Sequence, residues 1–600
     1  MRPVLARKTR MQRILVLLTT ALLLVACGGG PPAEAPAAPT AIPTPAAATI
    51  DTLRLVYWQT PRGLNPHLTI ATRDLEPARL IYEPLASVDK SNTLVPILAA
   101  EIPSIENGLV TADLTSVIWK LKDGVTWSDG RPFTANDVRF TWQFAMAEGI
   151  NADSRSVYSI IEDVEVVDPL TARVVFRFPT LAWDQPFVGL RGMILPQHIF
   201  EPFVAAGDRA GALSAAPVGT GPYTLTEFRT LETLFLGYEL VATNKLIFDA
   251  NPRFREAGKP YFPRIEWRGG GTADEAARLV LSPSDVDQAD YAWNLTTSPD
   301  LLADLEARGA GRVLTNLGPF VERISINATD PNPATGERSD PDTTGPEYLM
   351  RDPLVREAIS LAIDRERIVK LFPPGSEVTS NIIVAPDIYN STGTAIPYDP
   401  ARAARLLDQA GWVVGADGIR EREGVKLRLI YQASANKLRQ QTQQVVAESL
   451  RNIGVAIEIV VIDPNLYTDR TIAETNLYRF YAHFQQLFFG NVTTDPMPIL
   501  AFWTCPQIPR ASNGWQGSNF ERFCNPEFDA LFAEAQREIN PDRRRALIIR
   551  MNNLIVESVA AIPLVRRSQA SVVANSIEGV DLTPWDADVW NIHNWRRVNP

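Results

Sequence analysis

The chain has 600 residues, of which 45% are hydrophobic and 21% are charged, as is ordinary for globular proteins. A single core is insufficient at this length, so we expect two or three domains. The net charge of −11, with no basic run interleaved with aromatic residues, argues against nucleic acid as a partner. Beyond the N-terminus, no apolar run approaches the length of a membrane span.

The N-terminus has the pattern of a secretory signal. Basic residues from Arg2 to Arg13 precede the apolar run 14–25, which is shorter than the roughly 20 residues needed to cross a bilayer. Residues 1–26 are therefore predicted to be a signal peptide. The sequence Leu24-Val25-Ala26-Cys27 resembles the bacterial lipobox, which implies lipid attachment at Cys27. The alternative is an ordinary signal peptide in which this cysteine is incidental.

The segment 27–49 consists almost entirely of Gly, Pro, Ala and Thr. Its prolines forbid a helix and favour extended polyproline conformations, and it holds nothing that could form a core. We interpret it as a semi-rigid linker between the lipid and the folded domains.

Local patterns further along predict both helices and strands, so we expect a mixed α/β fold. Thr134 is an N-cap, with Asp137 completing a capping box. Alternating residues predict half-buried strands over 171–178 and 455–461, the second with Val455, Ile457, Ile459 and Val461 on one face. The stretch 330–346 is interpreted as a long surface loop or an insertion. Asp-Pro or Asn-Pro pairs that begin helices occur at Asp352, Asp399, Asn525 and Asn540, and Gly411 ends the second of these helices.

Two cysteines remain if Cys27 carries lipid. Cys505 and Cys524 are predicted to form a disulfide, because an exported compartment permits one. Two buried free thiols are the alternative. A zinc site is disfavoured because two cysteines without nearby histidines supply too few ligands.

The sequence offers little catalytic chemistry. Its histidines, His67, His198, His483 and His593, form no HExxH motif and no metal-ligand spacing, and no GxSxG motif is present. We therefore expect no catalytic residue, no metal and no cofactor. A surface-anchored hydrolase that uses paired carboxylates stays open as an alternative of a different class.

An ordered set of segments resembles the family 5 extracytoplasmic solute-binding proteins of ABC importers, the oligopeptide- and dipeptide-binding group. The resemblance extends over about residues 50–585, and the set as a whole is highly specific. The segments are LNPH at 64–67, IYEPLASVD at 81–89, LVPILAAEIP at 94–103, VIWKLKDGVTWSDGRPFTANDVRFTW at 117–142, PVGTGPY at 217–223, PLVREAISLAIDRERI at 353–368, YDPARAARLLDQAGW at 398–412, CNPEFDALFAEAQ at 524–536 and AAIPL at 560–564.

The resemblance implies a periplasmic-binding-protein-like fold of two lobes that close around a solute. Lobe one would comprise residues 50–318 and 565–600, with an extra subdomain at about 91–209, and lobe two would comprise 319–564. The implied partners are a small solute, most often a peptide in this family, and an ABC permease in the membrane. The protein would act as a monomer, held by its lipid on the extracytoplasmic face of the cell membrane or in the periplasm. An oligosaccharide or another polar solute is the alternative ligand.

Aromatic residues and one carboxylate are the candidates for lining the cleft. Peptide-binding members carry an amine-binding aspartate in a segment similar to 489–496. Here Asp495-Pro496 matches the end of that segment, but Val492 stands where the aspartate would be, which puts an ammonium-binding carboxylate in doubt. The predicted ligand-binding residues are Trp58, Trp293, Phe488, Phe489, Asp495, Trp503 and Trp515.

Overall fold

The computed structural model describes residues 51–69, 71–236, 239–284, 288–467, 477–491 and 493–598. The predicted signal peptide, Cys27, the linker and Val492 lie outside these residues. Residues 50–600 form one compact unit. Within the described ranges, no helix combines the length and the apolar character that a membrane crossing requires.

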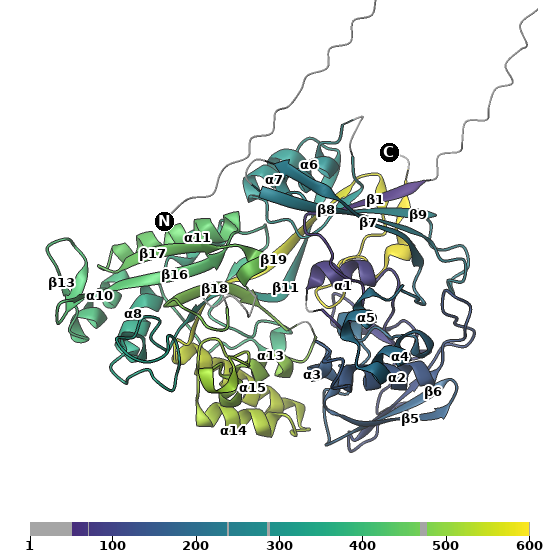
Figure 1. Cartoon of the computed structure of the whole chain (residues 1–600), viewed down its shortest axis with the longest axis horizontal. Helices are drawn as coiled ribbons and strands as arrows, with labels where there is room; N and C mark the ends of the chain where they lie inside the picture. The colour runs from purple at the N-terminus through teal and green to yellow at the C-terminus, as the bar shows by residue number, and fades with distance from the viewer. Residues whose placement is uncertain are drawn as a thin grey trace, which may run out of the picture. The chain divides into compact units, whose positions relative to one another are not determined.

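An eleven-stranded mixed sheet runs through this unit (Figure 1). Its order is β17 (Ala456–Ile462), β16 (Arg428–Ser434), β18 (Phe484–Phe489), β11 (Gly311–Ile326), β19 (Ala561–Ala574), β10 (Tyr291–Ala292), β1 (Thr52–Tyr57), β9 (Arg264–Gly269), β8 (Glu239–Ala250) and β7 (Tyr223–Leu236), with β12 (Glu377–Val378) paired to β19. β1 is parallel to β9 and β10, and β16 is parallel to β17 and β18.

Smaller sheets and the helices surround this main sheet. The smaller sheets are β4 (Ser116–Lys120), β6 (Thr171–Phe176) and β5 (Ile161–Asp168); β2 (Ala86–Val88) and β3 (Leu94–Pro96); β13 (Val413–Val414), β14 (Arg420–Arg422) and β15 (Val425–Lys426); and β20 (Ile577–Glu578) and β21 (Arg596–Arg597). The helices are α1 (Thr72–Ala78), α2 (Ala135–Met146), α3 (Arg155–Tyr158), α4 (Gln197–Ala206), α5 (Arg209–Ser214), α6 (Ala273–Leu281), α7 (Pro299–Glu306), α8 (Pro353–Ala362), α9 (Arg365–Val369), α10 (Pro400–Gln409), α11 (Lys437–Arg451), α12 (Pro464–Tyr467), α13 (Met497–Leu500), α14 (Pro526–Ala535) and α15 (Pro541–Glu557).

The long strands β11 and β19 connect the two halves of the main sheet. Residues 311–317 of β11 pair with 568–574 of β19 beside β10, whereas residues 321–325 pair with 561–566 of β19 and residues 321–326 pair with β18. The register shifts between Leu317 and Val321, and we call this irregularity in the pairing the bulge of β11. Both strands thus leave one half at this bulge and enter the other (Figure 1).

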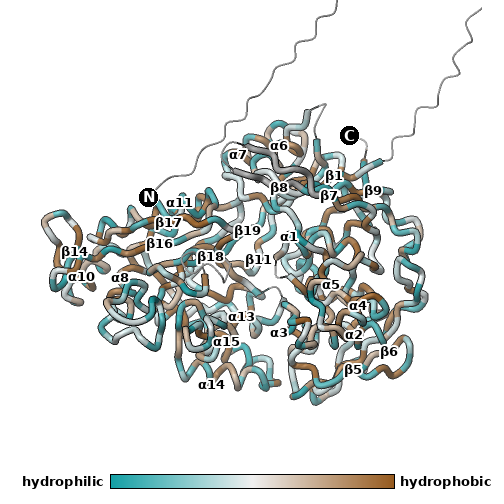
Figure 2. Tube along the Cα trace, in the orientation of Figure 1, coloured by the Kyte–Doolittle hydropathy of each residue, from teal (hydrophilic) through white to brown (hydrophobic). Residues whose placement is uncertain are grey.

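Each half of the sheet is covered by apolar packing on both faces. In the first half, Leu55 and Tyr57 belong to one core cluster, while Val56 faces α6 and α7 in another. In the second half, Ile324 packs with α8, α10 and α11. The small sheet β4-β6-β5 builds a further core around Trp119. Figure 2 shows hydrophobic and hydrophilic residues mixed along these elements, and the hydrophobic ones include those of the core clusters.

The predicted helix starts are confirmed. Thr134 caps α2 with a complete capping box, its side chain accepting from the helix backbone while the Asp137 carboxylate accepts from the backbone N–H of Thr134. The helix that begins after Asp399 ends before Gly411, which adopts a φ of +80°. The side chains of Asp352, Asn525 and Asn540 cap α8, α14 and α15 in the same way.

The two strand predictions have different outcomes. Within 171–178, residues 171–176 form β6, in which Val174 and Phe176 are buried as expected, whereas Phe178 lies beyond the end of the strand and is only partly buried. The segment 455–461 forms the edge strand β17, but the prediction of one buried face is wrong, because Val461 is 44% exposed. Instead Ile457 packs on one core cluster and Val460 on another, so both faces of this edge strand are partly covered.

The loop 330–346 holds no helix or strand, as predicted, but it is pinned by a buried residue. Ser339 is fully buried, and its hydroxyl donates to the carbonyl of Phe480 at 2.8 Å. Further along, a disulfide joins Cys505 to Cys524.

Candidate functional site

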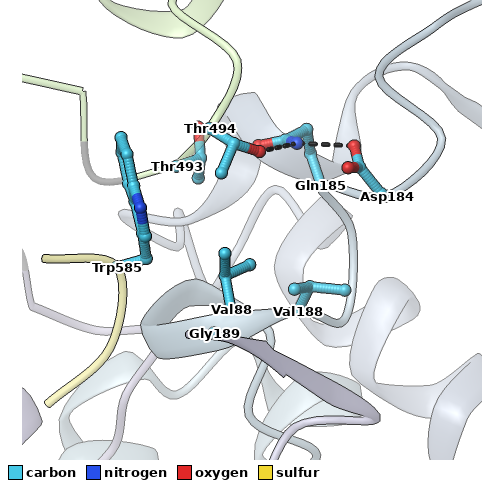
Figure 3. Close-up of a pocket in the computed structure, with 8 residues that line it drawn as sticks. All are labelled: Val88, Asp184, Gln185, Val188, Gly189, Thr493, Thr494 and Trp585. Atoms are coloured by element: carbon cyan, nitrogen blue, oxygen red, sulfur yellow. Dashed lines mark hydrogen bonds between the residues drawn. The ribbon is translucent and has the colours of Figure 1, made fainter. Parts of the chain in front are cut away.

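A small pocket forms where the two halves of the unit meet (Figure 3). A loop after β6 supplies Asp184 and Gln185 from one side, and the loop after β18 supplies Thr493 and Thr494 from the other. The Gln185 amide donates to the Thr494 hydroxyl at 3.1 Å, which bridges the two loops across 309 residues of sequence. The pocket has an empty volume of about 230 Å³, part of it open to solvent. Its lining residues are Val88, Asp184, Gln185, Val188, Gly189, Thr493, Thr494 and Trp585.

Glycine allows the C-terminal segment to reach this pocket. Gly189 has a φ of +60°, a left-handed conformation that favours glycine. A Cβ on Gly189 would lie 2.9 Å from the carbonyl oxygen of Trp585. The indole of Trp585 is fixed from the other end, because its Nε1 donates to the Asn92 side chain at 2.5 Å. The Trp585 ring therefore forms one wall of the pocket (Figure 3).

The loop after β18 is held by its own polar groups. The Asn491 amide donates to the carbonyls of Ala385 and Thr493, both at 2.8 Å. One oxygen of Asp495 accepts from the backbone N–H of Met497 at 2.9 Å. At the start of the loop, a Cβ on Gly490 would lie 2.3 Å from the carbonyl oxygen of Pro319, in the bulge of β11. The pocket loop is therefore packed directly on the point where the strands cross between the halves.

Charges beside the pocket leave one carboxylate without an ionic partner. Asp495 and Arg544 form a buried ion pair at 2.7 Å. Asp184 accepts a hydrogen bond from the Gln185 amide at 2.6 Å but forms no ion pair with any residue that the structure describes. Burial raises the pKa of Asp184 to about 6, and the negative charge of Asp495 contributes in the same direction, while the hydrogen bond from Gln185 and the positive charge of Arg544 oppose this shift.

The predicted tryptophans lie mostly within packed regions, and none of them lines this pocket. Trp58 donates to the carbonyl of Asn294 at 2.8 Å, and Trp293 is 2% exposed in the core, stacked on Tyr57. Trp503 is 1% exposed beneath the guanidinium of Arg323. Its Nε1 finds no hydrogen-bond partner among the described residues. The remaining one, Trp515, is buried beside Arg479. Their contact with a solute stays a prediction.

The two predicted phenylalanines lie on opposite faces of β18. Phe489 packs against Phe502 and Phe520, whereas Phe488 is 40% exposed. Two guanidinium groups, those of Arg439 and Arg567, lie over the Phe488 ring at 5.5 and 4.5 Å from its centroid.

Both of those arginines bind the buried carboxylate of Glu322. Arg439 Nε lies 2.9 Å and Arg567 Nη1 3.3 Å from it, and the Gln486 amide donates at 3.0 Å. Burial opposes ionisation of Glu322, but the positive charges of Arg439 and Arg567 prevail and hold its pKa below the ordinary value. Because Glu322 lies on β11 and Arg567 on β19, this cluster ties the two crossing strands together.

Paired carboxylates occur, but away from the pocket. The backbone N–H of Asp588 donates to Glu76 at 3.1 Å, and both side chains are buried. The hydroxyls of Tyr57, Tyr291 and Ser571 donate to the two carboxylates and enclose them. This pair belongs to the interior of the first half.

The sequence pointed to one part of the pocket and missed another. The segment 489–496 stands out in the sequence, and its Thr493 and Thr494 line the pocket, while Asp495, the next residue, binds Arg544. Asp184, Gln185 and Trp585 carried no local signal, because their role arises from a meeting of segments that are hundreds of residues apart.

Comparison with known proteins places this geometry in a family. The chain is 25% identical to Protein XP55 of Streptomyces lividans over 515 residues, which cover 83% of this chain and 81% of the relative. The structure of NikZ from Campylobacter jejuni in complex with Ni(L-His) matches with a TM-score of 0.72 at 21% identity, covering 91% of this chain and 99% of that one. The oligopeptide-binding protein AppA from Bacillus subtilis, in complex with a nonapeptide, matches with a TM-score of 0.72 at 19% identity and the same coverage.

These structural matches confirm the expected mixed α/β, periplasmic-binding-protein-like fold. The family model for bacterial extracellular solute-binding proteins, family 5, matches residues 93–507, which is more than half of the chain. The chain therefore belongs to the family 5 bacterial extracellular solute-binding proteins.

Proposed function

We propose that this protein is the solute-binding component of an ABC importer and delivers a short peptide to a membrane permease without altering it chemically. Its lobes would be residues 50–318 with 565–600, and 319–564. The observation that carries this proposal is the pocket between the halves, where Gln185 and Thr494 meet while only β11 and β19 connect the halves within the main sheet.

This arrangement would allow the two lobes to close around a solute. A solute that contacts both lobes stabilises the closed arrangement, because those contacts exist only when the lobes are together. A shift from mostly open to mostly closed requires about 5 kcal/mol of preference. The bulge in β11 at residues 317–321 is the natural place for the bend, since pairing is already interrupted there.

A peptide is the leading ligand because AppA, which shares this fold, was solved with a nonapeptide. The second candidate is another polar solute, such as an oligosaccharide. The similarity to NikZ favours keeping this candidate, because that protein was solved with Ni(L-His), which is not a peptide.

Binding of a peptide is the first test. The mature protein, purified without denaturation, is expected to carry or to accept short peptides, detected by mass spectrometry of the released ligand and by a rise in melting temperature. A rise in melting temperature with sugars but not with peptides would favour the second candidate, a polar solute such as an oligosaccharide. Turnover of a chromogenic peptide or glycoside by the pure protein would contradict it in favour of a hydrolase.

We also propose that Cys27 anchors the protein to the membrane. The substitution Cys27→Ser is expected to move the protein from the detergent-rich to the aqueous phase of a Triton X-114 partition, because it removes the acylated thiol. Substitution of Cys505 and Cys524 together by serine is the matched control and leaves the partition unchanged. Equal partition of Cys27→Ser and wild type would contradict the anchor.

A further inference from the structure

The pocket between the halves contains a carboxylate that forms no ion pair with any residue in the described part of the chain. Among the pocket-lining residues, Asp184 is the only one with a charged side chain. It accepts from the Gln185 amide, which simultaneously donates to Thr494. Figure 3 shows Asp184, Gln185 and Thr494 as one hydrogen-bonded row along the pocket wall. The carboxylate is therefore oriented by a neighbour that itself depends on the meeting of the two loops.

Asp184 and the charged groups that face it have a net negative charge. From the other half, Asp495 and Arg544 contribute opposite charges that pair with each other at 2.7 Å. Tyr389 lies beside that pair, and burial and the charge of Asp495 raise its pKa, so it stays neutral. The charge of Asp184 thus remains unbalanced, and a cation that enters the pocket is attracted.

The remaining lining suits a small cationic group. Thr493 and Thr494 carry hydroxyl oxygens that can accept hydrogen bonds from an ammonium group. Val88, Val188 and Trp585 are apolar and limit the access of water, which strengthens an ionic contact. Of the empty volume of about 230 Å³, part is open to solvent, and the enclosed part holds a group of about the size of a water molecule, which is also the size of an ammonium group.

We infer that Asp184 binds a primary ammonium group of the solute, from the first half of the protein. This inference rests on the proposed function and names the chemical class of its solute. The ammonium group belongs either to the N-terminus of a peptide or to a side chain or free amine, and both sources present the same chemistry.

The test uses the mature chain and three probes in titration calorimetry: trialanine, N-acetyl-trialanine and putrescine. Wild-type protein is expected to bind trialanine or putrescine at least ten-fold more tightly than N-acetyl-trialanine. The substitution Asp184→Asn is expected to weaken the affinity for the ammonium probe by roughly ten- to a hundred-fold, which corresponds to the free energy of a charge-assisted hydrogen bond. Asp304→Asn, at an exposed position on α7, is the matched control and leaves all affinities unchanged.

A pH series on unmodified protein tests the inference without any substitution. Because the pKa of Asp184 is raised to about 6, its carboxylate is ionised at pH 7.5 and mostly protonated at pH 5.0. Affinity for the ammonium probe is therefore expected to be about ten-fold weaker at pH 5.0. Asp184→Asn, checked for folding by circular dichroism, is expected to lose this dependence.

Each outcome separates the inference from the proposed function. Equal binding of free and acetylated trialanine, or an unchanged affinity in Asp184→Asn, overturns the inference and leaves peptide binding intact. Binding of putrescine alone supports the inference and contradicts the peptide. Binding of none of the three probes contradicts the inference and the peptide proposal together.

Discussion

Replacing Arg544 with methionine is expected to destabilise the protein by about 3–5 kcal/mol, because it leaves a buried carboxylate without its counter-charge. Arg544 is 5% exposed and binds Asp495 at 2.7 Å, and its Nε donates to the carbonyl of Ala535 at 3.0 Å. Urea titration followed by circular dichroism measures the loss. The same change also removes a positive charge near Asp184, so the acid midpoint of solute binding is expected to move to higher pH.

The neighbouring exposed residue provides the control for this prediction. Arg545→Met lies on the same helix, and its ion pair with Asp542 is exposed to solvent, so it is expected to cost less than about 1 kcal/mol. The double variant Asp495→Asn with Arg544→Met is expected to recover most of the stability, because no charge then stays buried alone. A double variant as unstable as Arg544→Met would show that packing, and not charge, explains the loss.

Replacing Glu322 with alanine is expected to cost a similar amount, about 3–5 kcal/mol, because two partly buried cations lose the buried carboxylate that they share. Glu322 is 1% exposed and bound by Arg439 and Arg567. Since the cluster joins β11 to β19 close to the bulge, the loss is expected to loosen the crossing and to weaken solute binding as well. Urea titration and calorimetry on the same samples measure the two effects.

The pH dependence of Glu322 has a definite sign. Its pKa is held below the ordinary value in the folded state, so its contribution to stability is present above the unfolded pKa of about 4 and is lost as pH falls through the folded pKa. The difference between wild type and Glu322→Gln is therefore expected to shrink in acid. Glu366→Ala, at an exposed position on α9, is the control and should change stability little at any pH. A difference that stays constant down to pH 3 would contradict the ionic account.

Local hydrogen bonding explains which parts of the fold were predictable. The caps at Thr134 and Asp399 depend on side chains that bind backbone groups two or three residues away, so the local sequence is sufficient. The failure at Val461 has the opposite cause. β17 lies at the edge of the sheet between two core clusters, and period-two alternation cannot show which clusters a strand will meet.

The candidate site was predictable only where it coincided with a family segment. Thr493 and Thr494 lie in the segment 489–496, which the family resemblance indicates. The prediction that Trp293 and Trp503 bind ligand rests on residue type alone, and both side chains are buried in packed regions. Large aromatic side chains fill cores as readily as they line clefts, so residue type does not distinguish the two roles.

The sequence by itself determined the family, through an ordered set of segments, and the ends of several helices, through their capping residues. Only the tertiary structure decided that Gln185 meets Thr494 and that Asp184 faces a pocket without an ionic partner among the described residues. The physical reason is the sequence separation of the contacts. A helix cap forms within one helical turn, whereas the pocket depends on how β11 and β19 position two separately packed halves against each other.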